Sequence, residues 1–142
     1  MSVIRLLPVL VLASLLLLGC GPGEGSVFSL AEGECFDDPE DTSDIREVPL
    51  VACDQPHDNE VFATFDLEDG DFPGSAEVEE QALSGCTERF PAQVAEEYGD
   101  DELVIGVLTP TSDSWSGGDR EVVCFLSSED GLLTGSLLGA DR

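Results

Sequence analysis

The sequence predicts a small α+β domain, in which one helical segment packs on a mainly antiparallel sheet and two disulfides cross-link the chain. Three observations support this class. Short apolar or alternating runs recur along the chain between turn-forming residues, as is typical of strands. A single stretch, residues 76–90, has helical spacing instead. Four cysteines follow an N-terminal segment that resembles an export signal.

The first three strands are expected at residues 27–36, 48–53 and 60–67. Pro49 places the second strand at an edge or near its own start, because proline cannot donate to a strand ladder. Residues 37–44 form an acidic loop between the first two strands. Residues 60–67 place Val61, Ala63, Phe65 and Leu67 at every second position and are rich in residue types that favour β-structure. This pattern predicts a strand rather than a helix.

The helical segment is expected to begin after Ser75, a suitable N-cap residue. Pro91 should interrupt it, and a second turn or helix at residues 92–98 should end at Gly99. The apolar residues predicted to share one helix face are Val78, Ala82, Leu83, Cys86 and Phe90.

The last third of the chain predicts three further strands. Residues 103–108 form a continuous apolar run, which predicts a buried strand. Residues 121–126 are expected to form another strand, after a long polar loop at residues 109–118. Asp130-Gly131 predicts a hairpin turn, after which residues 132–138 return as the last strand.

Residues 1–19 combine Arg5 with an apolar run of signal-peptide length and are followed by Cys20. This ending resembles a bacterial lipobox, which implies cleavage before Cys20 and a lipid such as palmitate on its sulfur. A plain secretory signal and a retained membrane helix are less favoured alternatives. We therefore expect a signal peptide over residues 1–19, a flexible tether over 20–27, and a domain over 28–142. The domain would lie on the extracytoplasmic face of the cell membrane.

The charge balance restricts the partners. After Cys20 the chain has four arginines, no lysine and 31 acidic residues, a formal charge of −27. Such a chain repels nucleic acid and anionic lipid headgroups, so no nucleic-acid partner is expected and the lipid is the membrane contact. The absence of lysine is typical of GC-rich genomes and hints at an actinobacterial source.

The remaining cysteines, Cys35, Cys53, Cys86 and Cys124, are even in number, which predicts two disulfides. Four cysteines allow three pairings, and the sequence does not choose among them. We favour Cys35–Cys53 and Cys86–Cys124, since these keep the closed loops short relative to the crossed alternatives. No C-x-x-C pair is present, which disfavours a zinc site.

His57 is the only histidine, and Glu60 follows three residues later. The pair could be a metal site or a general acid and base. We favour a structural role, in which Pro56 fixes the turn and the ring of His57 bonds to Glu60 or to a backbone carbonyl.

Two further stretches carry candidate binding residues. Trp115 and Arg120 flank a Gly-Gly-Asp turn that contains Asp119. Tryptophan and arginine are both frequent in the hot spots of binding interfaces. The favoured alternative is that Trp115 covers the sheet edge and Arg120 pairs with a carboxylate. Residues 37–44 and 66–71 could bind calcium weakly, but they lack the EF-hand order and a solvated loop is favoured.

Several motifs together resemble one family. Gly33-Glu34-Cys35-Phe36 precedes a C-x-x-P-H-x-x-E-V-F element at residues 53–62, and Cys86, Trp115, residues 118–120, Cys124 and residues 133–137 follow in order. This chain resembles the septum-formation domain family of actinobacterial membrane-associated proteins, although Glu34 stands where that family usually has Asp. The resemblance implies a disulfide-bonded extracytoplasmic domain, and it does not imply a reaction.

The sequence leaves two functional hypotheses. No G-x-S-x-G element or metal-ligand cluster is found, so we expect no catalytic residue, cofactor or metal. The favoured hypothesis is a lipid-anchored, non-enzymatic domain that binds a protein or a cell-envelope component, in connection with septum formation. The alternative is an envelope metal-dependent hydrolase that uses His57 and Glu60.

Overall fold

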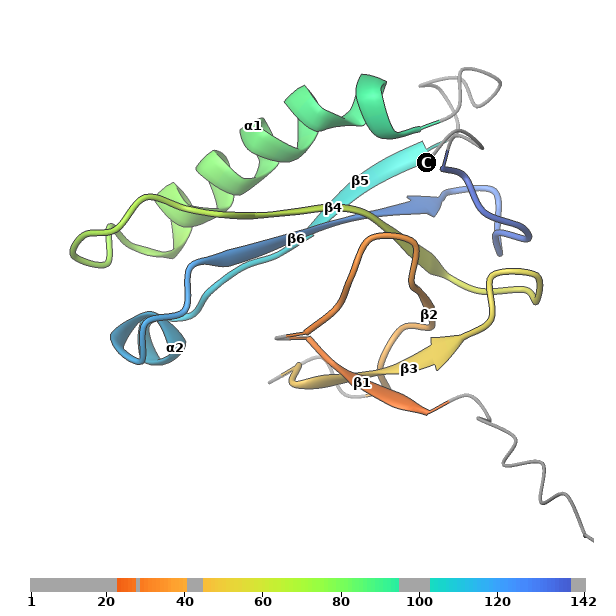
Figure 1. The fold of residues 1–142 in the computed structure, drawn as a ribbon, viewed down its shortest axis with the longest axis horizontal. Helices are drawn as coiled ribbons and strands as arrows, with labels where there is room; N and C mark the ends of the chain where they lie inside the picture. The colour runs from red at the N-terminus through yellow and green to blue at the C-terminus, as the bar shows by residue number, and fades with distance from the viewer. Residues whose placement is uncertain (1–22, 28, 41–44, 95–102, 139–142) are drawn as a thin grey trace, which may run out of the picture.

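A computed structural model describes residues 23–27, 29–40, 45–94 and 103–138 of the chain. They form one antiparallel sheet of strand order β1-β3-β2-β4-β6-β5, together with two helices (Figure 1). The predicted α+β class is therefore confirmed. The elements are β1 (Glu24–Ser26), β2 (Cys35–Phe36), β3 (Glu47–Val51), β4 (Asn59–Asp66), α1 (Ser75–Gln93), β5 (Leu103–Leu108), α2 (Ser112–Ser116) and β6 (Glu121–Ser128).

The two long strands β4 and β6 pair at the centre of the sheet and supply a core to each of its faces. Successive side chains of a strand point to opposite faces, so β6 sends alternate residues to alternate sides. Val122, Cys124 and Leu126 belong to the core beneath α1. Val123 belongs to a second core, whose other buried residues are Leu30, Phe36, Val48 and Val61.

Helix α1 packs on β4, β5 and β6, and the strands β1 and β3 at the other end of the sheet lie on the side away from α1 (Figure 1). Val78, Ala82 and Cys86 of α1 are buried against the sheet, as their spacing predicts. Leu83 was expected on the same face but is 46% exposed. It follows Ala82 by only one residue, so it is turned about 100° away from it on the helix surface.

Both predicted disulfides are confirmed. Cys35–Cys53 links β2 to the residues after β3, and Cys86–Cys124 links α1 to β6. The Cα atoms are 5.3 Å apart in the first pair and 5.5 Å apart in the second, which is within the usual range for a disulfide.

The N-terminal strands differ from the prediction in their extent. Glu24–Ser26 pair with residues of β3, so the sheet begins inside the range expected to be a tether. The strand expected over residues 27–36 is reduced to Cys35–Phe36, because the backbone turns at Ala31 and Gly33 before it pairs with β4. Pro49 lies in β3, between β1 and β2.

The helix boundaries also differ. Gly74, rather than Ser75, is the N-cap residue of α1, and the helix continues through Pro91 to Gln93. Pro91 lies in the last turn, so the missing N–H and the clash of its ring disturb only the end of the helix, which stops two residues later. Residues 95–98 of the expected second helix lie outside the described residues. The loop expected at residues 109–118 contains the short helix α2, capped by a Thr111–Ser114 capping box.

The prediction of a last strand at residues 132–138 is wrong. Residues 132–138 make only isolated bridges, His57 with Leu133 and Val94 with Leu138. Gly135 has a φ of 86° between these bridges, which interrupts extended pairing. Leu133 and Leu137 are nevertheless buried, so the segment packs against the core without joining the ladder.

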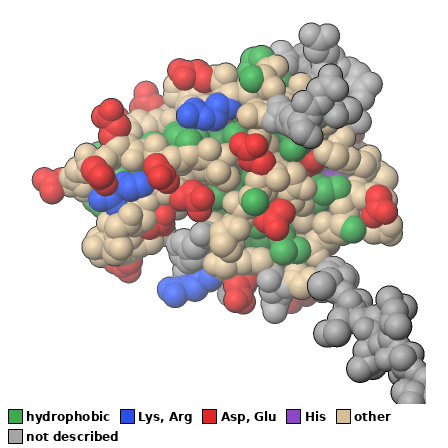
Figure 2. All heavy atoms as spheres, viewed as in Figure 1, with side chains coloured by type: hydrophobic (Ala, Val, Ile, Leu, Met, Phe, Trp, Pro, Cys, Tyr) green, Lys and Arg blue, Asp and Glu red, His purple; other side chains and the backbone are tan. Residues whose placement is uncertain are grey.

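Among the described residues, no helix is long and apolar enough to cross a membrane. Acidic side chains are spread over the whole face shown in Figure 2, and few basic side chains lie among them. This distribution follows from a composition with 31 acidic and five basic residues.

Candidate functional site

The C-x-x-x-H-x-x-E segment forms a buried cluster at one end of β4. Cys35 and Glu60 are direct cross-strand partners in the pairing of β2 with β4. The sulfur of Cys35, a ring nitrogen of His57 and a carboxylate oxygen of Glu60 lie within 4.8 Å of one another. All three side chains are buried, and Cys53 joins them through its disulfide with Cys35.

His57 lies in a turn that is tied to the C-terminal segment. Its backbone N–H donates to Leu133 O at 3.0 Å, and its own carbonyl accepts from Leu133 N at 2.8 Å. Its Nδ1 lies 2.8 Å from the carbonyl oxygen of Gln55, which is a backbone carbonyl, one of the two partners expected. A carbonyl only accepts, so Nδ1 carries the proton. Nε2 is buried and has no hydrogen-bond partner among the described residues.

Glu60 binds the C-terminal segment rather than His57. Its carboxylate accepts from the hydroxyl of Ser136 at 2.5 Å and from the backbone N–H of Leu137 at 2.6 Å. A buried carboxylate with two short hydrogen bonds joins segments that are far apart in the sequence. Ser136 lies in one of the stretches that carry the family resemblance, and its sequence context predicts only a turn or a packing position.

The turn also holds the start of the acidic loop. Asn59 donates from Nδ2 to the carboxylate of Asp38 at 2.9 Å, and Asp38 N–H donates to Asp58 at 3.0 Å. These carboxylates are therefore used in hydrogen bonds to the polypeptide. Pro56 is exposed at the tip of the turn. Residues 41–44 of the loop lie outside the described residues.

Trp115 and Arg120 form a second, structural cluster. Trp115 is buried in the core under α1, and its Nε1 donates to Gly70 O at 2.9 Å. The guanidinium of Arg120 stacks 3.8 Å from the centre of the indole ring and donates to the carbonyls of Trp115 and Asp119. Arg120 also pairs with Asp69 at 3.3 Å. Trp115 therefore lies in the core, and Arg120 has the carboxylate partner expected for it.

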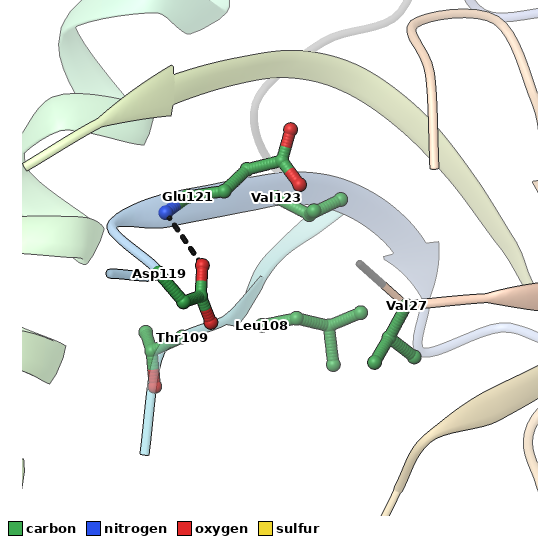
Figure 3. A pocket seen from close by; sticks show the side chains of 6 residues that line it. All are labelled: Val27, Leu108, Thr109, Asp119, Glu121 and Val123. Atoms are coloured by element: carbon green, nitrogen blue, oxygen red, sulfur yellow. Dashed lines mark hydrogen bonds between the residues drawn. The ribbon is translucent and has the colours of Figure 1, made fainter. Parts of the chain in front are cut away.

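Carboxylates line two hollows beside this cluster. Asp66, Asp69, Asp119 and Glu121 contribute to an open hollow of about 480 Å³. Asp119 and Glu121 also line a small pocket of about 30 Å³ with the apolar Leu108 (Figure 3). Asp119 accepts a hydrogen bond from the backbone N–H of Glu121. Burial raises the pKa of the Glu121 carboxyl above its usual range, and the nearby charges of Asp66 and Asp119 raise it further.

The comparison with protein families identifies the chain. The model of the septum formation family matches residues 25–124, which include both disulfides, His57, Glu60 and Trp115. The chain therefore belongs to the septum formation family. Comparisons with curated proteins and with solved structures find no match.

Proposed function

We propose that this protein is a non-enzymatic binding domain that takes an extended, basic segment of a partner protein at the edge of its sheet and acts in septum formation. We further propose that a lipid on Cys20 holds it at the extracytoplasmic face of the cell membrane. The observation that carries the binding proposal is the outer edge of β5.

Within the described part of the chain, β5 pairs with β6 only. Its sequence, LVIGVL, contains no charge and no proline, the devices that usually protect a sheet edge. All six residues are at least partly exposed, and Val104 is 40% exposed. An edge of this kind offers unpaired N–H and C=O groups to an added strand, and this is a common mode of peptide recognition.

Charges at both ends of β5 indicate the chemistry of the partner. Leu103 pairs with Ser128, and the exposed Glu129 and Asp130 follow directly. At the other end, Leu108 shares a pocket with Asp119 and Glu121 (Figure 3). A second copy of this chain would bring the same negative charges, whereas a segment rich in lysine or arginine would be attracted.

The buried cluster supports a non-enzymatic role. His57 and Glu60 are both fully buried, and the Glu60 carboxylate is occupied by Ser136 and Leu137. A general acid or base must come within hydrogen-bond reach of its substrate. These side chains instead hold the turn and the C-terminal segment against the sheet.

A peptide of alternating lysine and valine tests the binding proposal. We expect it to bind the full chain in detergent, as measured by fluorescence anisotropy, with an affinity that falls as salt is added. Val104→Lys should weaken binding by about tenfold or more, since it places a positive charge at the edge. Leu132→Lys is the matched control, because Leu132 is 60% exposed in the segment after β6 and the charge change is the same.

Equal weakening by both variants would show that net charge, rather than the β5 edge, determines binding. The connection with septum formation is tested in cells that produce Val104→Lys or Leu132→Lys as their only copy of the chain. We expect altered septum placement or frequency with Val104→Lys only. Normal septa with both variants would contradict the proposal that edge binding serves septum formation.

A further inference from the structure

We infer that the Cys35–Cys53 disulfide masks a zinc site. After reduction, the two thiolates of this pair, Nε2 of His57 and the carboxylate of Glu60 would bind one Zn²⁺. The inference concerns the reduced chain and does not depend on the proposed function.

The four side chains are already gathered. Cys35, His57 and Glu60 place one ligand atom each within 4.8 Å of one another, and the sulfur of Cys53 is bonded to that of Cys35. Zn²⁺ prefers four ligands in a tetrahedron drawn from cysteine, histidine and carboxylate groups. Reduction would free both sulfurs to rotate about their Cα–Cβ bonds, with Cα atoms 5.3 Å apart.

The second observation is the state of the His57 ring. The ring is fully buried, and Nε2 has no hydrogen-bond partner in the part of the chain that the structure describes. Because Nδ1 donates to the carbonyl of Gln55, Nε2 carries a lone pair in the neutral ring. Zinc-binding histidines commonly have this arrangement, in which one nitrogen binds the metal and the other donates to a carbonyl or carboxylate. A metal would satisfy a buried atom that the oxidised chain leaves unpaired.

Glu60 is also held in place. The Ser136 hydroxyl and the Leu137 N–H orient its two oxygens, and each oxygen keeps a second lone pair for a metal. Such outer hydrogen bonds fix the ligands of metal sites in other proteins. The cluster therefore needs little rearrangement besides the opening of the disulfide.

The two disulfides differ in their accessibility. Cys86 and Cys124 are both fully buried, whereas Cys53 is partly exposed. Thiol–disulfide exchange requires a thiolate to reach a sulfur atom, so Cys35–Cys53 is the pair that a reductant can attack.

We propose a dithiol as the reductant. One of its thiolates attacks the sulfur of Cys53, the S–S bond breaks, and Cys35 leaves as a thiolate. The second thiol of the reductant loses its proton and displaces Cys53 as a thiolate, so the dithiol is oxidised to its disulfide, and the two protein thiolates take up protons from water. Zinc binding then releases the protons of the two protein thiols.

The test uses the full chain in detergent, reduced with a phosphine that does not compete strongly for zinc. After removal of the phosphine, Zn²⁺ is titrated against a chromogenic chelator. We expect one zinc per reduced chain and none per oxidised chain. In the reduced form, His57→Ala should weaken binding by about tenfold to a hundredfold or more. Asp54→Asn is the matched control, because its exposed carboxylate is next to Cys53 and outside the cluster.

A second measurement needs no variant. Alkylation of the reduced wild-type chain, mapped by mass spectrometry, should label Cys53 and Cys35 first, and zinc should protect these two cysteines. The proposal is wrong if all four cysteines are labelled at equal rates, if zinc protects none of them, or if the oxidised chain binds zinc equally well. Equal zinc affinity of His57→Ala and the wild type would also overturn it.

Discussion

His57→Ala in the oxidised chain is the sharpest test of the structural role assigned to this histidine. The ring is fully buried, and Nδ1 donates to the carbonyl of Gln55 at 2.8 Å. Loss of this hydrogen bond costs about 1 kcal/mol. Removal of the buried ring costs a further ~2–3 kcal/mol, somewhat less than the truncation of a larger phenylalanine.

One contribution to the change in the free energy of unfolding has the opposite sign. Nε2 is buried and has no partner within the described ranges of the wild type, so its removal returns about 1 kcal/mol of desolvation cost. The expected net loss is about 2–3 kcal/mol in the free energy of unfolding. For a domain of this size that corresponds to a fall of roughly 10–20 °C in the melting temperature.

The assay is urea unfolding followed by circular dichroism, with both disulfides verified by mass. His57→Asn is the control, since the asparagine amide can donate from near the position of Nδ1, and we expect it to be about 1 kcal/mol more stable than His57→Ala. A change of less than about 0.5 kcal/mol in His57→Ala would refute the reasoning, because it is the size expected at an unimportant surface site. Zinc binding by the oxidised chain that disappears in His57→Ala without a change in stability would refute it as well.

Four further predictions concern other parts of the chain. Cys20→Ala should abolish fractionation with membranes, and unchanged membrane association would contradict lipidation at this residue. Arg120→Ala should lower the free energy of unfolding by about 1–3 kcal/mol, because its guanidinium stacks on Trp115 and donates to two backbone carbonyls. Asp69→Asn should change the free energy of unfolding by less than about 0.5 kcal/mol in the same urea assay, since the Asp69 side chain is 96% exposed. Glu121 has a raised pKa in the folded chain, so the folded state holds this proton more strongly and stability falls as pH rises above about 4.5 through the raised pKa. Glu121→Gln should therefore be slightly more stable than the wild type at pH 7 and equally stable at pH 3, and a loss of stability at pH 7 would contradict this.

The helix and the central strands could be predicted because they depend on local patterns. The β-rich run of β4 and the helical spacing of Val78, Ala82 and Cys86 match buried residues in the structure. The apolar run of β5 is a strand as expected, but none of its residues is fully buried, because β5 lies at the edge of the sheet. Loop length favours the observed disulfide pairing, and the register of the sheet explains it. Cys35 pairs with Val51 near the end of β3, and this brings it close to Cys53.

The C-terminal segment could not be predicted in the same way. Residues 132–138 contain apolar side chains that are typical of a strand, yet Leu133, Gly135 and Leu137 hydrogen-bond to individual residues elsewhere in the chain. The Leu137 N–H binds the Glu60 carboxylate, and Leu133 bridges to His57. Tertiary hydrogen bonds of this kind replace a ladder and have no periodic signal in the sequence.

The sequence alone determined the composition-dependent properties of this protein. A charge of −26 and four cysteines beyond Cys20 follow from counting residues, and they restrict the partners and the cross-links whatever the fold. Only the tertiary structure decided how His57 and Glu60 are used. Their spacing would fit a metal site or an acid–base pair equally well. The pairing of β2 with β4 buries both side chains beside a disulfide. There the carbonyl of Gln55 accepts from one ring nitrogen of His57, and Ser136 and Leu137 donate to the carboxylate of Glu60. The sequence could not show this, because Ser136 and Leu137 come from a distant segment that only the fold brings next to Glu60.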